Sequence, residues 1–166
     1  MPEKQTIDRA RQDKREGKSA TTQAGEFVRE EMHHIREGKH GARSAKQAIA
    51  IGLSKARRAG VDLPPPKRGK VSEKSWKSAE RAYEEGQGQR HARHQPRIAK
   101  AVKGVLKREG HQAASHEALS KQARSAAKRR THAERSAAAE KAAHTKGATG
   151  RSAVAREAAR TRAADR

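Results

Sequence analysis

Two carboxylate–histidine pairs are the first residues in this sequence whose types and spacing could do chemistry. Glu30 and His33, and Glu31 and His34, are each three residues apart, so in a helix each pair shares one face. Di-iron helical bundles use this spacing, but they need two such motifs and two further Glu residues on facing helices. His91 and His94 have no Cys or acidic partner at metal-site spacing. We therefore expect no metal ion and no cofactor.

The sequence also shows no motif that predicts a catalytic site. Gly86 and Gly88 form a Gly-x-Gly without a preceding strand, so they do not predict a phosphate-binding loop. Ser and His residues are numerous, but no pattern predicts that they are buried or that an oxyanion hole surrounds them. We expect that the protein is not an enzyme and has no catalytic residue.

Basic residues carry the strongest signal. Within the segment expected to be helical after Ser115, Lys and Arg recur at spacings of three, four and seven residues, so one helix would present them along one side. A second group lies on the exposed face expected for a helix ending near Gly60. The predicted DNA-binding residues are Lys121, Arg124, Lys128, Arg129, Arg130, Arg135, Arg151, Arg156, Arg160, Arg162, Lys46, Lys55, Arg57 and Arg58.

The charge balance points to a polyanionic partner. The 166 residues include 40 Lys and Arg against 19 Asp and Glu, a net charge of +21. Residues 97–166 alone hold 18 basic and six acidic residues. Neutralising DNA phosphates with such side chains releases condensed counterions, which drives binding without sequence preference. The chain has no Asn and only three aromatic residues, which disfavours base readout and single-strand stacking.

Hydrophobic periodicity predicts a small all-α protein. After a charged segment over 1–21, Val28, Met32 and Ile35 fall on one helical face, with Thr22 as the expected cap. Ser44 and Gln47 form a capping-box pattern before Ile49 and Leu53. Together these signals predict a helical hairpin over 22–60. Because two short helices make a thin core, a homodimer or a third helix would be needed to cover it.

The remaining chain is expected to be extended and basic. Pro- and Gly-rich linkers over 61–96 flank a short helix at 72–85, whose Trp76 and Tyr83 are expected to pack in the core rather than dock a partner. Residues 97–166 form an Ala-rich basic arm, helical or disordered, with a break expected at Thr131 and another between Thr145 and Gly150.

The segment from Gln47 to Arg57, QAIAIGLSKAR, resembles the QAIAIxLSxAR hairpin of an uncharacterised family of small basic proteobacterial DNA-binding proteins. The C-terminal Ala/Arg/Lys composition is similar to that of histone tails. The resemblance implies nucleic-acid binding and assigns no residue a role.

These signals favour a nucleoid-associated protein that coats or compacts duplex DNA without sequence specificity. Two alternatives remain open: an RNA- or ribosome-associated protein, and a protein-interaction module whose basic tail only localises it. No apolar run or leader pattern is evident, so we expect a cytoplasmic protein without a membrane partner.

Overall fold

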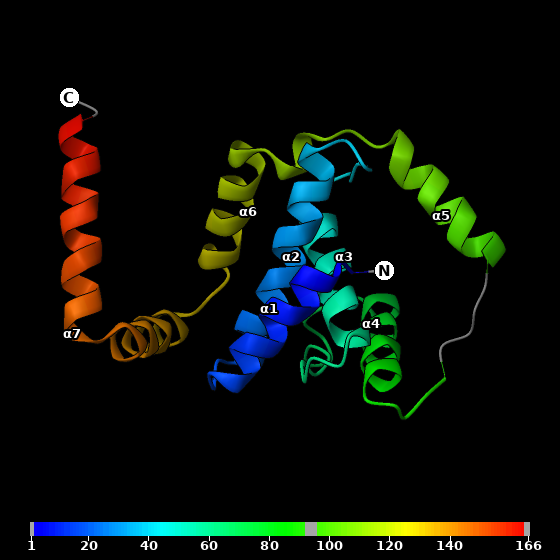
Figure 1. Cartoon of the computed structure of the whole chain (residues 1–166), viewed down its shortest axis with the longest axis horizontal. Coiled ribbons are helices and arrows are strands. Elements are labelled where there is room, and N and C mark those ends of the chain that lie inside the picture. Colours follow the sequence, from blue (N-terminus) through cyan, green and yellow to red (C-terminus); the bar gives the residue numbers. More distant parts are fainter. Residues whose placement is uncertain (1, 92–95, 165–166) are drawn as a thin grey trace. The chain divides into compact units, whose positions relative to one another are not determined.

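The computed structural model describes residues 2–91 and 96–164, and within them the chain is all-α, as predicted (Figure 1). These residues form no strand. The chain divides into two compact units, one ending at Gln122 and the other beginning at Ala123. The helices are α1 (Lys4–Arg15), α2 (Ala20–Arg36), α3 (Ala45–Arg58), α4 (Glu73–Gly86), α5 (Pro96–Arg108), the short 3-10 helix η1 (Gln112–Ala114), α6 (His116–Lys128) and α7 (His132–Ala164).

Helices α2 and α3 pack against each other at the centre of the N-terminal unit. The Ser44 hydroxyl accepts from Gln47 N at 3.2 Å, as the capping pattern predicts, while the Gln47 side chain accepts from Arg43 N at 2.9 Å. Helix α2 starts earlier than expected, because Ser19 rather than Thr22 is its N-cap. The predicted stop after α3 is confirmed: Gly60 has a φ of 86° and Val61 N donates to Ala56 O at 3.1 Å.

Two glycines allow their helices to approach closely. A Cβ on Gly52 of α3 would lie 2.7 Å from the Cα of Val28 in α2, so only glycine permits this crossing. Gly86 at the end of α4 lies so close to the carbonyl oxygen of Arg57 that any Cβ there would collide with it. These contacts, together with buried Ala82, dock α4 on α3.

Helix α1 is part of the core, although its sequence shows no apolar stripe. Ala10 of α1 is buried against Ala24 and Phe27 of α2 and Ala56 of α3, with Ile7 partly buried beside them. A short helix is marginal when alone, but packing on α2 supplies the stability that the sequence of α1 lacks.

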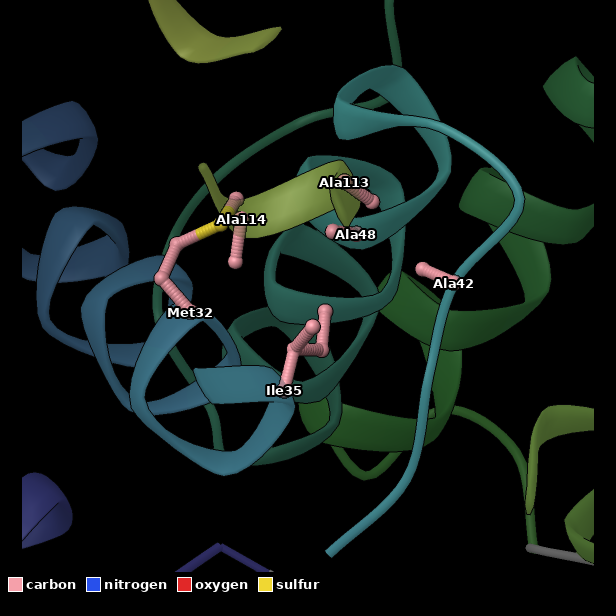
Figure 2. Packing of buried hydrophobic residues seen from close by; sticks show 6 residues of the cluster. All are labelled: Met32, Ile35, Ala42, Ala48, Ala113 and Ala114. Atoms are coloured by element: carbon pink, nitrogen blue, oxygen red, sulfur yellow. The ribbon is translucent and has the colours of Figure 1, made fainter. Parts of the chain in front are cut away.

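A second core cluster takes two of its residues from far along the chain. Met32 and Ile35 of α2 pack with Ala42 and Ala48, and with Ala113 and Ala114 of η1 (Figure 2). The Arg36 side chain also donates from Nε to Ala114 O at 2.9 Å. The N-terminal unit therefore extends well past residue 97, where the sequence suggested that a separate arm begins.

Other elements of the same chain cover part of the apolar face of the hairpin. Helices α1 and α4 and the segment η1 contact α2 or α3 within the same chain. Helix α5 differs, because Ile98, Val102 and Val105 remain exposed on it. Its C-terminal end is held by backbone hydrogen bonds from Gly41 N to Leu106 O and from Ala42 N to Gly110 O.

The basic arm was expected to be helical or disordered, and its described part is helical. The break at Thr131 is confirmed: Thr131 N donates to Glu134 Oε2 at 2.8 Å, and Glu134 N donates to Thr131 Oγ1 at 3.2 Å. A second break occurs at Gly147, whose φ of 63° and ψ of 179° interrupt α7. None of the helices in the described ranges is both long enough and apolar enough to cross a membrane.

Candidate functional site

Most of the predicted DNA-binding residues are exposed on the helices that follow η1. Lys121, Arg124 and Lys128 lie on α6, and Arg129 and Arg130 follow it directly. Arg135, Arg156, Arg160 and Arg162 are exposed on α7. Arg151 is within α7, but its side chain lies outside the described residues.

These basic residues do not share one continuous stripe. Lys121, Arg124 and Lys128 have the spacing of one face of α6, as predicted. Arg135 belongs to the next helix, because α6 ends at Lys128 and the capping box at Thr131 begins α7. The expectation that one helix presents all four residues is therefore wrong.

Ion pairs between described side chains are found in the part of the chain that ends at Arg90. In the N-terminal unit many cations have an acidic partner, such as Arg9 with Glu26, Lys18 with Asp13, and Arg58 with Glu85. By contrast, the exposed cations from Arg124 to Arg135 form no ion pair with any residue that the structure describes. Residues 123–166 hold 12 Lys and Arg against four Asp and Glu. The positive charge of Arg124 to Arg135 is available for an external anion to neutralise.

On α3, only part of the predicted basic face points outward. Lys46 and Arg58 are exposed. Arg57 is buried, and it donates from Nε to Leu63 O at 3.0 Å and from a terminal nitrogen to Pro64 O at 3.4 Å. Burial also lowers the pKa of Arg57. Its role is to hold the Pro-rich loop against α3, so the prediction that it faces DNA is wrong.

Lys55 likewise turns inward, toward two acidic residues of α2. It donates to Glu31 Oε1 and lies 3.7 Å from Glu30 Oε1. Both carboxylates are buried, with Glu31 fully enclosed. A buried carboxylate requires a paired cation, and Lys55 supplies it, which corrects the prediction that this lysine binds DNA.

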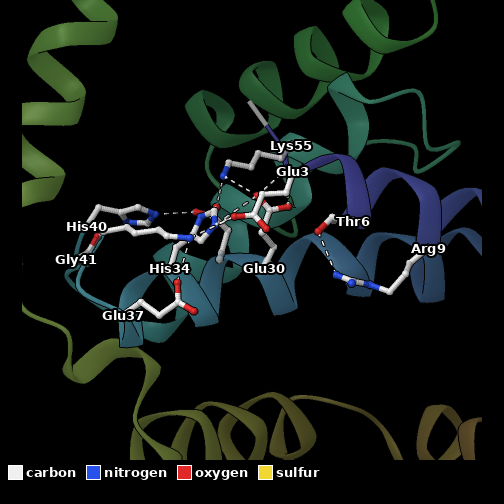
Figure 3. Close-up of polar contacts among 11 residues, drawn as sticks. Glu3, Thr6, Arg9, Glu30, His34, Glu37, His40, Gly41 and Lys55 are labelled. Carbon is white, nitrogen blue, oxygen red and sulfur yellow. Dashed lines mark hydrogen bonds and ion pairs between the residues drawn. The ribbon is translucent and has the colours of Figure 1, made fainter.

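Around Glu31, the structure assembles a polar cluster that the sequence did not predict (Figure 3). His34 of α2 places Nδ1 3.7 Å from Glu31 Oε1, and His40 of the following loop places Nε2 3.5 Å from Glu31 Oε2. The two imidazole rings meet edge to face, with centroids 6.1 Å apart. Glu31, His34 and His40 have ligand-type atoms that all lie within 4.8 Å of one another.

The N-terminal segment closes one side of this cluster. Glu3 Oε1 lies 2.9 Å from His34 Nε2 and 3.2 Å from Lys39 Nζ, and Glu3 N donates to the Glu30 carboxylate at 3.3 Å. The hydrogen bond with His34, followed by that with Lys39, lowers the pKa of Glu3. Glu3 is therefore ionised at neutral pH and acts as an acceptor.

Sequence reasoning identified Glu31 and His34 as a pair but missed His40. The signal was present as a further Glu-x-x-His, from Glu37 to His40. In the structure this spacing is not helical, because α2 ends at Arg36 and Gly38 has a φ of 74°. The turn brings His40 back toward Glu31, which only the folded chain reveals.

An apolar groove of about 550 Å³ lies between α3, the Pro-rich loop and α4. Leu53, Pro64, Val71 and Ala79 are among its lining residues. Trp76 is only half-buried and stacks under the Arg68 guanidinium, whose carbon lies 4.1 Å from the ring centroid. Trp76 is in neither core cluster, so α4 docks through Ala82 and Gly86 rather than through the expected aromatic face.

Comparison with known proteins gives one match. A model described as a family of unknown function, DUF6496, matches residues 13–68, which include α2, α3 and the QAIAIGLSKAR segment. Comparisons with curated proteins and with solved structures give no significant match. The matched family has no assigned activity, so the resemblance to DNA-binding proteins stays a prediction.

Proposed function

We propose that the protein binds duplex DNA without sequence specificity, through the exposed basic residues of α6 and α7. The observation that carries this proposal is the contrast in charge pairing. Several cations in the part of the chain up to Arg90 form ion pairs with acidic residues, whereas those from Arg124 to Arg135 form none among the described residues. A dense, unneutralised positive charge is the feature that phosphate binding requires.

The helical form of the arm suits a regular array of phosphates. Lys121, Arg124 and Lys128 recur once per turn of α6, and the alanines between them keep the helix narrow. Duplex DNA carries one charge per about 1.7 Å of axis, so a helix with this spacing can neutralise several phosphates together. Neutralisation along the duplex supports coating or compaction, and hence association with a nucleoid.

A salt titration tests this proposal. Affinity of the full chain for a mixed-sequence duplex is measured by fluorescence anisotropy over a range of salt concentrations. We expect log K to fall with log salt, with a slope of about −0.9 for each phosphate contacted. Replacing Lys121, Arg124, Lys128, Arg129 and Arg130 by Gln should make the slope shallower by up to about 0.9 per lost contact.

The control removes the same net charge from a part of the chain far from α6 in sequence, residues 11–74. Its five replacements by Gln are at exposed cations, namely Arg11, Lys14, Lys67, Lys70 and Lys74. If binding depends on the residues of α6, this variant keeps most of the original slope. Equal loss in both variants would show that only net charge matters, and the assignment to α6 and α7 would be wrong.

The alternatives are separated in the same experiment. Structured RNA is added as a competitor at matched salt, and preferential displacement of the duplex would favour an RNA- or ribosome-associated role. Weak binding to both nucleic acids at physiological salt would instead favour a protein-interaction module, for which the groove beside Leu53 and Pro64 is the available surface.

A further inference from the structure

We propose that Glu31, His34 and His40 form a binding site for one divalent transition-metal ion of the zinc class. Two His and one Glu are a ligand set found in zinc sites that keep an open position for water. The three residues come from α2 and from the loop that follows it, all within the N-terminal unit. The proposal departs from the expectation, drawn from sequence, that no metal is bound.

The first argument concerns which nitrogen of each imidazole is free. A carboxylate accepts hydrogen bonds, so His34 Nε2 donates to Glu3 Oε1 at 2.9 Å. The carbonyl of Gly41 can also only accept, so His40 Nδ1 donates to it at 3.1 Å. In neutral rings, the lone pairs therefore lie on His34 Nδ1 and His40 Nε2, the two atoms that face Glu31.

The outer hydrogen bonds match what metal-binding histidines require. A ligating His almost always donates its other N–H to a carboxylate or a backbone carbonyl, which fixes the ring and its tautomer. Here one histidine uses the Glu3 carboxylate and the other uses the Gly41 carbonyl. Both rings are thus oriented by groups outside the cluster, and their other nitrogens face the Glu31 carboxylate.

The second argument is an unpartnered buried oxygen. Glu31 is fully buried, and its Oε2 accepts no hydrogen bond from any described residue. Lys55 serves the other oxygen, Oε1. Leaving a buried acceptor without a partner is costly, and two lone pairs facing it add repulsion. A cation bound between Glu31 Oε2 and the two imidazoles would give the buried oxygen a partner. It would also remove the repulsion from the two nitrogen lone pairs.

The third argument is the local charge. Ion pairs connect Glu31, through Lys55, His34, Glu3 and Lys39, to a network with four carboxylates and two ammonium groups. The carboxylates belong to Glu3, Glu30, Glu31 and Glu37, and the ammonium groups to Lys39 and Lys55. With neutral imidazoles this network is doubly negative in a chain of net charge +21. A divalent ion would cancel that charge.

The dimensions fit after small side-chain movements. Zinc binds nitrogen and carboxylate oxygen at about 2.0–2.2 Å, so tetrahedral ligand atoms lie about 3.3 Å apart. His40 Nε2 lies 3.5 Å from Glu31 Oε2, His34 Nδ1 lies 3.7 Å from Glu31 Oε1, and the ligand atoms of the three residues all lie within 4.8 Å of one another. Binding would tie the loop containing His40 to α2, and the same loop holds the end of α5 through Gly41 and Ala42.

Titration of the full chain with Zn²⁺ tests the proposal. After removal of metals by a chelator, isothermal calorimetry should give one tight equivalent per chain, and Co²⁺ should give visible absorption typical of a tetrahedral site. His40→Ala should abolish the tight equivalent. Glu3→Gln, which leaves every proposed ligand in place, should weaken binding by about 10–100-fold.

The matched control is His33→Ala, because His33 is the exposed neighbour of His34 on the same helix and is not in the cluster. This variant should bind Zn²⁺ as tightly as the original chain. Circular dichroism confirms that each variant is folded. Absence of a tight equivalent in the original chain would overturn the proposal, and so would equal losses in His33→Ala and His40→Ala.

Discussion

At the scale of single residues, position in the fold decides what a charged side chain does. Lys55 and Arg57 belong to the same basic run as Arg58, yet only Arg58 is exposed. Lys55 meets the buried carboxylate of Glu31, and Arg57 meets the carbonyls of Leu63 and Pro64. Sequence alone gives charge and spacing, but the acceptors of these side chains come from other segments and become neighbours only on folding.

Tyr83 gives a direct test of one such contact. Its hydroxyl donates to Asp62 Oδ1 at 2.7 Å, and this hydrogen bond, followed by burial, raises the pKa of Tyr83. Tyr83 is the only tyrosine, so ultraviolet absorbance reports its titration alone. We expect a midpoint above the ordinary value of about 10, and a return toward that value in Asp62→Ala.

The sign of the effect on stability follows from the raised pKa. The hydrogen bond stabilises the protonated phenol, so its contribution is present below about pH 10 and is lost as pH rises through the folded-state value. Asp8→Ala, which removes an exposed carboxylate on α1, should leave the Tyr83 titration unchanged. An unaltered midpoint in Asp62→Ala would show that the contact does not form in solution.

At the scale of elements, close helix packing depends on small residues. The crossing of α2 and α3 uses Gly52, and the core beside α1 uses Ala10, Ala24 and Ala56. The sequence predicted α2, α3 and α4 to within a few residues, because the spacing of their apolar residues marks them. It did not predict the packing of α1, because an alanine contact leaves no apolar stripe and its partner lies in another helix.

Gly52→Ala tests the crossing. The new methyl group would lie 2.7 Å from the Val28 backbone, so the helices must separate. We expect a loss of about 1–3 kcal/mol in the free energy of unfolding, as for other overpacked cores. The measurement is urea unfolding followed by circular dichroism.

Gly25→Ala is the control for that substitution. Gly25 lies within α2, is exposed, and has open space where a Cβ would go. Because alanine favours the helix over glycine, this variant should be more stable by about 0.5–1 kcal/mol. Opposite signs at the two glycines are expected, and a neutral Gly52→Ala would contradict the close crossing.

At the scale of the whole molecule, the chain joins an N-terminal unit that contains several ion pairs to a C-terminal region in which Arg124 to Arg135 form none among the described residues. The boundary between them is not where the sequence suggested. Composition becomes strongly basic near residue 97, but the N-terminal unit continues to Gln122 and includes Ala113 and Ala114. Composition cannot reveal that two alanines inside a basic region complete a distant core.

Ala114→Glu tests this boundary in the full chain. Ala114 is fully buried against Met32 and Ile35, so a carboxylate there would be buried without a partner. We expect a loss of about 3–5 kcal/mol, the range for an uncompensated buried charge. Thermal unfolding measures it, and exposed Ala123→Glu on α6 should stay within about 0.5 kcal/mol of the original chain. Similar losses of stability in the two variants would show that η1 does not pack in the core.

The late arrival of Ala113 and Ala114 also has a consequence for biosynthesis. A ribosome completes α2 and α3 long before it reaches η1, so Met32 and Ile35 emerge with one side of their cluster still missing. At about 5–20 residues per second, the interval from Arg58 to Ala114 lasts roughly 3–11 s. During that time the nascent chain presents an apolar surface to chaperones, and a transcript truncated within the interval yields a product that never covers it.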